Sequence, residues 1–162
     1  MRFFYVKKGA TNMKKIFACL VFSLLTTISV FSQSSAVLSE MIETEKASYA
    51  QASYLPAIYA NLVSDEASLE DAFKALSDNG YFNENTNSQE SLSLSQLSFI
   101  YVKVFQIKGG LFCRMFNSPR YAFKELKAQG VLPPEADPAM FVSGRDVIDI
   151  FNQCLEIDGE NE

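Results

Sequence analysis

AFKALSDNG, residues 72–80, recurs fifty residues later as AFKELKAQG, residues 122–130. The same offset continues without a gap through a loop and into a second segment, where Leu97 faces Val147. Apolar residues recur in both copies at the three-and-four spacing of amphipathic helices. A fixed period of this length indicates repeated helical units that stack, because one short helix pair cannot bury its apolar face alone. The alternative is a chance likeness between two amphipathic helices.

Local signals mark where the helices of each unit end and begin. Gly80 and Gly130 follow the first helix of each unit, at the position where a helix closes with left-handed backbone. Each second helix begins with a capping box, in which a serine and an acceptor three residues later satisfy two helix amides. The boxes pair Ser48 with Gln51, Ser93 with Gln96, and Ser143 with Asp146. The pattern therefore predicts three second helices, at spacings of 45 and 50 residues.

These signals predict an all-α fold of five or six short helices in tandem helix–loop–helix units. We expect the repeat domain over residues 47–156, after an N-terminal segment over 33–46 and before a disordered acidic tail over 157–162. Within the N-terminal segment, Ala36 to Lys46 is a candidate for a degenerate first helix. Pro56 lies about two turns into the first of the second helices. Because proline removes a backbone donor, we expect a kink there or a split into two short helices.

The glycine and capping positions resemble those of the S-layer homology (SLH) family. That family repeats a helix, a glycine-containing loop and a second helix that opens with a capping box, and the resemblance covers roughly residues 47–156. It implies a compact three-fold prism of three units that holds cell-wall polymers outside the cell. It also implies a partner of that kind for this chain.

The chain departs from the family at the residues that hold the polymer. The arginine that follows the capping residue is replaced by Tyr49, Leu94 and Gly144, and the chain contains no tryptophan. The Asp-Gly turn and the Phe-x-Pro piece of the family's loop are also missing from the loops of these units. The resemblance therefore implies a fold, while the binding residues of the family do not carry over.

The N-terminal 32 residues are expected to be a secretory signal peptide. Two lysines precede an apolar run from Ile16 to Phe31, and small polar residues follow it. This order is typical of a signal with cleavage before Gln33, or alternatively after Ala36. Met13 is an alternative start. The 16-residue run is shorter than the ~20 residues of a spanning helix, so a retained membrane anchor and a lipoprotein site at Cys19 are the less favoured alternatives.

Removal of this segment would leave a strongly acidic protein. Five of the 14 basic residues lie within it and all 19 acids follow it, so the remainder carries nine basic residues and a net charge of −10. Such a body repels nucleic-acid backbones and anionic membranes, so we expect no nucleic-acid partner. Contact with a membrane is expected only through an uncleaved N-terminal segment. The sequence does not fix the oligomeric state.

One segment, residues 105–123, departs from this charge pattern, because it holds three cations, five aromatic residues and no acid. Aromatic faces and guanidinium groups there could bind a sugar or an anionic polymer. The binding residues that we select are Lys108, Phe112, Arg114, Phe116 and Arg120. The alternative is that the aromatic residues are core and that the cations only extend outward from it.

Two cysteines remain after the predicted signal, Cys113 and Cys154. An even number in an oxidising compartment makes them a candidate disulfide. The alternative is two buried thiols, which behave as small apolar side chains.

No catalytic or metal-binding constellation is evident. The chain has no histidine, which excludes histidine-based nucleophile pairs and most transition-metal sites. The oxygen-rich loop over residues 78–90 lacks the glycine and the twelfth-position acid of a calcium loop. We therefore expect no cofactor and no metal. We expect a non-catalytic exported cell-envelope protein that acts as a binding module or adaptor for a wall polymer or another envelope protein. The alternatives are a small periplasmic enzyme, a regulator of a cell-wall enzyme, or a purely structural subunit of an envelope assembly.

Overall fold

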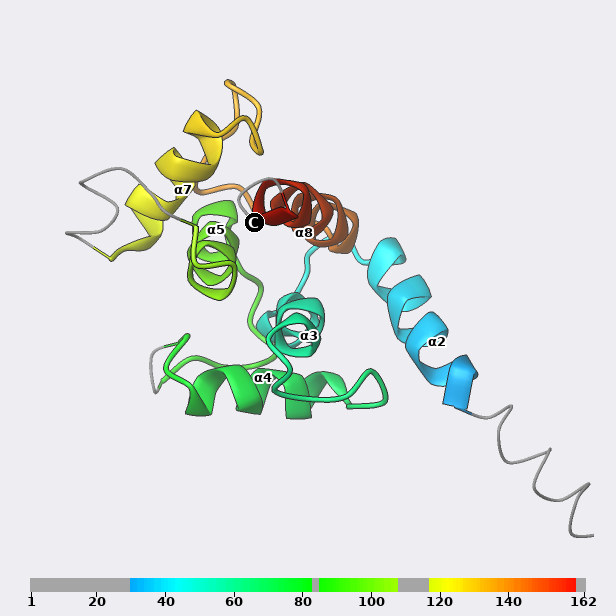
Figure 1. Ribbon diagram of the computed structural model, residues 1–162. Helices are drawn as coiled ribbons and strands as arrows, with labels where there is room; N and C mark the ends of the chain where they lie inside the picture. The colour runs from blue at the N-terminus through cyan, green and yellow to red at the C-terminus, as the bar shows by residue number, and fades with distance from the viewer. Residues whose placement is uncertain (1–29, 83–84, 108–116, 160–162) are drawn as a thin grey trace, which may run out of the picture. The chain divides into compact units, whose positions relative to one another are not determined.

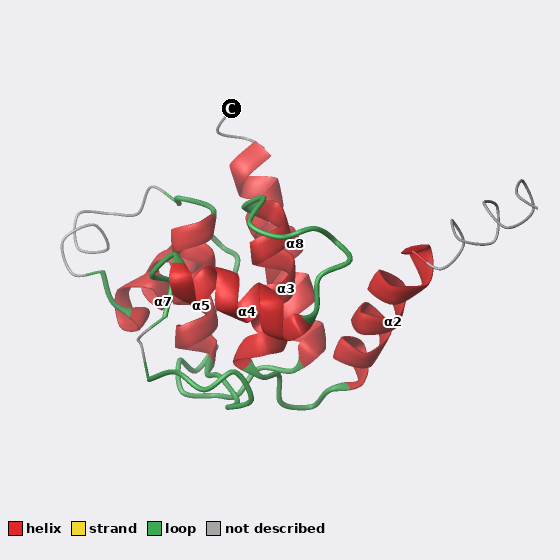
Figure 2. Ribbon diagram, turned by 90° about the horizontal axis from the view of Figure 1, so that it is seen from below, coloured by secondary structure: helices red, strands yellow, loops and turns green. Residues whose placement is uncertain are grey.

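The computed structural model describes residues 30–82, 85–107 and 117–159, and their secondary structure is helical (Figures 1 and 2). The all-α prediction is confirmed. The described helices are α2 (Val30–Glu43), α3 (Tyr49–Tyr59), α4 (Leu69–Asp78), α5 (Leu94–Val104), α7 (Pro119–Ala128) and α8 (Gly144–Gly159). Extended pairing within these ranges is limited to two isolated bridges.

The chain divides into two compact units, Met1–Val37 and Leu38–Glu162, with the division inside α2. The second unit therefore begins nine residues before the repeat domain that the sequence predicted. At its other end α8 continues to Gly159, so the first three residues of the predicted tail are helical, and residues 160–162 lie outside the described ranges. The description below concerns the second unit.

The fifty-residue offset holds for the outer helices of this unit. α4 and α7 begin and end at positions fifty residues apart. Gly80 and Gly130 follow their C-caps with φ angles of +75° and +80°, the left-handed conformation that favours glycine. Ser118 is the N-cap of α7 and Pro119 is its first residue. Proline is favoured at the first helical position because its fixed φ suits a helix and a backbone N–H there has no partner within the helix.

The three predicted capping boxes are present. The backbone N–H of Ser48 donates to Gln51 Oε1 (3.0 Å), and that of Ser93 donates to Gln96 Oε1 (2.7 Å). In α8 the backbone N–H of Ser143 donates to Asp146 Oδ2 (2.8 Å). The reciprocal bonds from the backbone N–H of residues 51, 96 and 146 to the serine Oγ atoms measure 3.3, 3.4 and 3.1 Å.

The helices that pack most extensively are α3 with α4 and α5 with α7. We call these two pairs the α3–α4 hairpin (residues 49–78) and the α5–α7 hairpin (residues 94–128). Each joins the second helix of one predicted unit to the first helix of the next. The two helices of a predicted unit, such as α4 and α5, therefore do not pack mainly against each other. The apolar face of α4 is instead buried against α3, the helix that precedes it in sequence.

The three second helices contact one another and form the centre of the unit (Figure 1). The residues just before their capping serines close a ring of backbone hydrogen bonds. Ala47 N–H donates to Val142 O (2.8 Å), Leu92 N–H donates to Ala47 O (3.2 Å), and Val142 N–H donates to Leu92 O (3.4 Å). All three residues are fully buried. Loops gather at one end of the central helices, as Figure 2 shows.

The first amide of each central helix extends this ring. Tyr49 N–H donates to Glu90 O, Leu94 N–H to Met140 O, and Gly144 N–H to Thr44 O, at 3.0, 2.8 and 2.9 Å. Each central helix and the residues that lead into it form one sector of the ring. In the third sector, a Cβ on Gly144 would lie 1.8 Å from the carbonyl oxygen of Met41. Glycine at this position lets α8 begin against the end of α2.

Aromatic rings fill the space farther along the central helices. Tyr59, Tyr101, Phe105 and Phe151 form one cluster, in which the Tyr59 and Phe105 ring centroids lie 4.5 Å apart. α3 is one helix that runs through the buried Pro56 and ends three residues later, so the predicted split into two helices is wrong. Pro56 cannot donate a backbone hydrogen bond within the helix, and its burial in this core offsets that loss.

Candidate binding surface on the α5–α7 hairpin

Most of the predicted binding segment lies outside the described residues. This holds for Lys108, Phe112, Arg114 and Phe116, and also for Cys113. Arg120 is described and lies exposed in the first turn of α7. The aromatic residues at the two ends of the segment, Phe105 and Phe123, are buried, which confirms the core interpretation for these two.

The buried face of α7 determines which of its cations reach solvent. Ala122, Phe123 and Leu126 are buried in the α5–α7 hairpin. The residues on the other side of a helix with this spacing face water. Arg120 and Lys124 are exposed there, one turn apart.

Lysines on this hairpin lie over aromatic rings. Lys124 Nζ is 5.7 Å from the Tyr121 ring centroid, and Lys127 Nζ is 5.6 Å from that of Phe123. Lys127 Nζ also donates to the carbonyl oxygen of Ala136 at 3.5 Å, so this amine is partly engaged within the protein. Cation–π contacts at exposed sites contribute ~0.5–1 kcal/mol each. They hold the ammonium groups in place without neutralising them.

Lys103 extends the basic surface onto α5, and the sequence reasoning missed it. Its Nζ lies 4.5 Å from the Phe99 ring centroid and donates to Gly80 O at 3.0 Å. Partial burial lowers the pKa of Lys103 below its usual value. This lysine ties α5 to the turn that follows α4. The spacing of Phe99 and Lys103, four residues apart on a helix, is the signal that could have found it.

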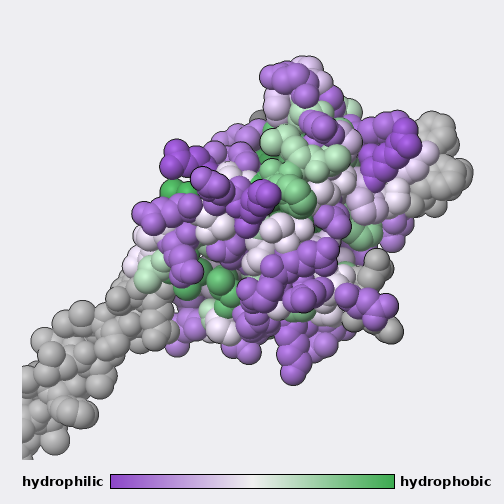
Figure 3. All heavy atoms as spheres, turned by 180° about the vertical axis from the view of Figure 1, so that it is seen from behind, coloured by the Kyte–Doolittle hydropathy of each residue, from purple (hydrophilic) through white to green (hydrophobic). Residues whose placement is uncertain are grey.

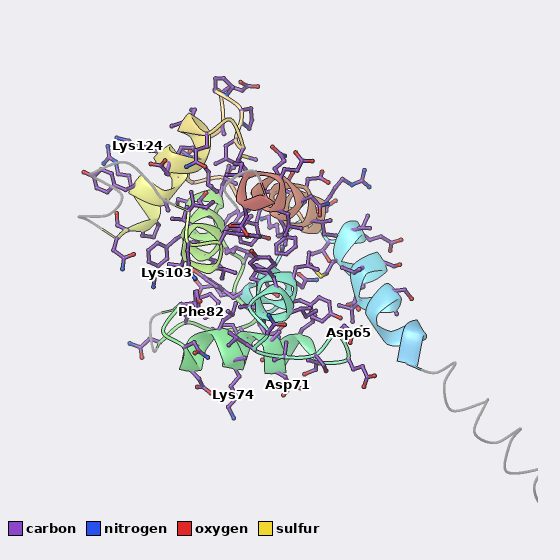
Figure 4. All side chains as sticks on the ribbon, viewed as in Figure 1. Asp65, Asp71, Lys74, Phe82, Lys103 and Lys124 are labelled. Carbon is purple, nitrogen blue, oxygen red and sulfur yellow. The ribbon has the colours of Figure 1, made fainter. Side chains whose placement is uncertain are left out.

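The two hairpins carry opposite charge. In sequence, residues 94–128 hold six of the nine basic residues that follow the predicted signal and one acid, a net charge of +5; Lys108 and Arg114 among them lie outside the described residues. The α3–α4 hairpin holds five acids and Lys74, a net charge of −4. Figure 4 shows Lys103 and Lys124 projecting from the basic hairpin, while Asp71 and Lys74 project from α4.

Cys154 is a free, fully buried thiol on the core side of α8. Burial raises its pKa to about 12, so the thiol is neutral at physiological pH and is not a nucleophile. Pairing with Cys113 stays a prediction, because that residue is not described. Within the described ranges there is no cluster of cysteine and carboxylate side chains that could hold a metal ion.

The positions that hold arginine in the SLH pattern lie at the starts of the central helices. Tyr49, Leu94 and Gly144 are all buried there. The Tyr49 ring packs edge-on against Phe82, with centroids 5.4 Å apart. These positions contribute to the core, so a binding surface on this protein has to use other residues.

No family model, no curated protein and no solved structure matches the chain. Within the described part of the chain, no helix has the length and hydropathy needed to cross a membrane.

Proposed function

We propose that this protein is a non-catalytic, exported component of a bacterial cell envelope that binds an anionic wall polymer through the α5–α7 hairpin. The observation that carries the proposal is the charge of that hairpin. It has a net charge of +5, whereas the chain after the predicted signal has a net charge of −10.

The chemistry of the exposed side chains suits a polyanion. Arg120 offers planar N–H pairs that match carboxylate and phosphate oxygens, and Lys124 adds a point charge one helical turn away. A helix rises ~1.5 Å per residue, so these two Cα atoms are about 6 Å apart along α7. Tyr121, half-buried between them, offers a ring face that a sugar can stack against.

The acidic remainder of the surface favours one orientation of the bound polymer. Like charges repel, so a polyanion approaches the α5–α7 hairpin and avoids the α3–α4 hairpin. The envelope location rests on the signal-like N-terminal segment and on the SLH resemblance. The three-sector backbone ring is compatible with the three-unit prism that this resemblance implies.

Co-sedimentation with purified cell wall tests the proposal. We expect the purified protein to sediment with wall in low salt and to be released as salt rises, because exposed ion pairs are screened within ~10 Å at 0.1 M and ~3 Å at 1 M. Wall from which anionic polymers have been extracted should retain much less protein. Retention that is indifferent to both treatments would contradict the proposal.

Matched variants locate the surface. The double variant Arg120→Gln/Lys124→Gln should bind wall about two- to thirtyfold more weakly, since each exposed charge contributes ~0.2–1 kcal/mol. Lys74→Gln is the control, because Lys74 occupies on α4 the position that Lys124 occupies on α7. Equal binding by the two variants would contradict a site on the α5–α7 hairpin. Turnover of a glycan panel by the wild type would favour the enzyme alternative.

A further inference from the structure

The third sector of the ring differs from the other two in how its central helix is covered. α3 packs along α4, and α5 packs along α7. Among the described helices of the second unit, none packs along α8 in this way, and its main neighbours are α3 and α5. Its outer contact comes from the end of α2, where Met41 O meets Gly144. One side of α8 is therefore less covered than its two equivalents.

Large exposed apolar side chains occur at the end of α2, just before α8 and on α8 itself. The large hydrophobic residues that are exposed within the described ranges are Ile42 (44%), Met140 (45%), Phe141 (51%) and Leu155 (37%). Ile42 lies in the last turn of α2, Met140 and Phe141 lead into α8, and Leu155 lies on α8 itself. We call these four residues the α8 flank. Figure 3 shows that hydrophilic residues predominate over one face of the molecule, with separate hydrophobic areas among them.

The two chain segments that carry the α8 flank are rich in acids. Residues 40–46 and 140–158 hold seven acids and two cations, Lys46 and Arg145, a net charge of −5. Lys46 lies over the Phe141 ring, with its Nζ 4.9 Å from the centroid. An apolar surface with an acidic border fits a partner that presents cations around an apolar or aromatic face.

The chain itself carries a surface of that description. The α5–α7 hairpin presents Arg120 and Lys124 beside the half-buried Tyr121. We propose that the α8 flank of one copy binds α7 of a second copy, at Arg120, Tyr121 and Lys124. The two surfaces lie on different parts of the chain, so the contact is head-to-tail and can extend into a chain of molecules or close into a ring.

Charge complementarity can act at contact range although each molecule is acidic overall. At 0.15 M salt the screening length is ~8 Å, so repulsion between distant charges is damped while neighbouring opposite charges still attract. The contact is expected to be weak, because four partly exposed side chains provide less apolar area than a standard interface of ~800 Å² per partner. It uses the same cations as the proposed polymer site, so polymer and second copy compete.

Sedimentation velocity of the purified full chain tests this inference. We expect concentration-dependent association at 0.15 M salt that decreases at 1 M. A wild type that sediments as one species at every concentration, or association that strengthens at 1 M, would overturn the proposal. Strengthening would indicate purely apolar contacts.

Two single-face variants make the test specific. Arg120→Gln/Lys124→Gln removes charge from the hairpin, and Phe141→Gln/Leu155→Gln removes apolar area from the α8 flank. Each alone should associate about tenfold more weakly than the wild type. Mixed together they should form a 1:1 dimer that does not extend, because one intact hairpin and one intact flank remain. Failure of the mixture to dimerise would contradict the proposal even if both variants are weakened.

Two controls separate this inference from the proposed function. Lys74→Gln should associate like the wild type, because Lys74 lies on the acidic hairpin. The α8-flank variant should keep its binding to cell wall. If wall binding is lost in the hairpin variant while association is unchanged in both variants, the polymer site stands and the second-copy contact is wrong. Circular dichroism confirms that each variant is folded.

Discussion

The α3–α4 and α5–α7 hairpins are built from the same buried pattern and carry opposite surfaces. Ala72 and Leu76 of α4 have their equivalents in Ala122 and Leu126 of α7, and all four are buried. Yet the net charge is −4 on one hairpin and +5 on the other. The buried residues and the turn glycines therefore specify the repeated fold. The exposed residues are free to differ, and they carry the proposed function.

The largest effect is expected at Gly144, where the backbone of α8 leaves no room for a side chain. Gly144→Ala places a Cβ 1.8 Å from Met41 O, a backbone atom that cannot move aside cheaply. We expect a loss of more than about 3 kcal/mol in the free energy of unfolding, by analogy with severe core overpacking. Urea denaturation measures it. Gly159→Ala is the control, since a Cβ there meets nothing within 4 Å and should cost nothing.

Equivalence of the two cores is tested by Leu76→Ala and Leu126→Ala. Both side chains are fully buried, so each truncation should cost about 3 kcal/mol through lost transfer energy and a residual cavity. The two losses should agree within about 1 kcal/mol. A difference of severalfold would show that the hairpins are not packed alike.

The turn glycines provide a smaller and cleaner comparison. Gly80→Ala and Gly130→Ala each force a residue with a Cβ into the left-handed region, at about 1 kcal/mol. A Cβ meets no atom within 4 Å at either position, so the cost is conformational and should be equal in both variants. If either variant is as stable as the wild type, the positive φ at that turn is wrong.

Alkaline pH should destabilise the protein through the buried thiol of Cys154 on α8. Its folded pKa of about 12 lies above the usual 9.0, so its stabilising effect is complete below pH 9 and is lost as pH rises through the folded value. Between pH 8 and 10 the wild type should lose about 1 kcal/mol from this thiol. Cys154→Ala should show a correspondingly flatter profile by thermal denaturation. Parallel profiles would mean that the thiol is not buried.

The smallest effect on folding is expected from surface charge. Lys74→Gln and Lys124→Gln should each change the unfolding free energy by less than about 0.5 kcal/mol, because both side chains are exposed. If the two variants are equally stable and only Lys124→Gln binds wall more weakly, the hairpins differ in binding and not in folding. A large loss of stability in either variant would show that its exposed charge also supports the fold.

The local parts of this architecture could be predicted from the sequence, and the long-range parts could not. Ser93 with Gln96 and the glycine at position 130 are signals contained within a few residues, and the structure confirms both. The association of α4 with α3 depends on which apolar faces meet, and the fifty-residue repeat allows either partner. The ring through Ala47, Leu92 and Val142 joins residues whose own side chains give no sign of it.

The candidate site was predicted in part. The basic, aromatic segment over residues 105–123 belongs to the more basic of the two hairpins, and Arg120 is exposed on α7, while a binding role for it stays a prediction. Lys103 was missed because it lies just before the segment that we selected, and its contact to Gly80 O joins residues 23 apart in sequence. The α8 flank was missed because Phe141 and Met140 look like core residues in sequence. Both are exposed in the structure, beside a helix along which no described helix of the second unit packs.

Amide hydrogen exchange at the ring tests the central claim, that three equivalent sectors close on one another, most directly. The N–H groups of Ala47, Leu92 and Val142 are buried and bonded in a cycle, so all three should exchange only when the whole unit unfolds. We predict the same slow rate for all three, equal to that of the slowest core amides. Faster exchange at Ala47 than at Leu92 and Val142 would mean that the N-terminal segment does not close the ring, and would contradict the account.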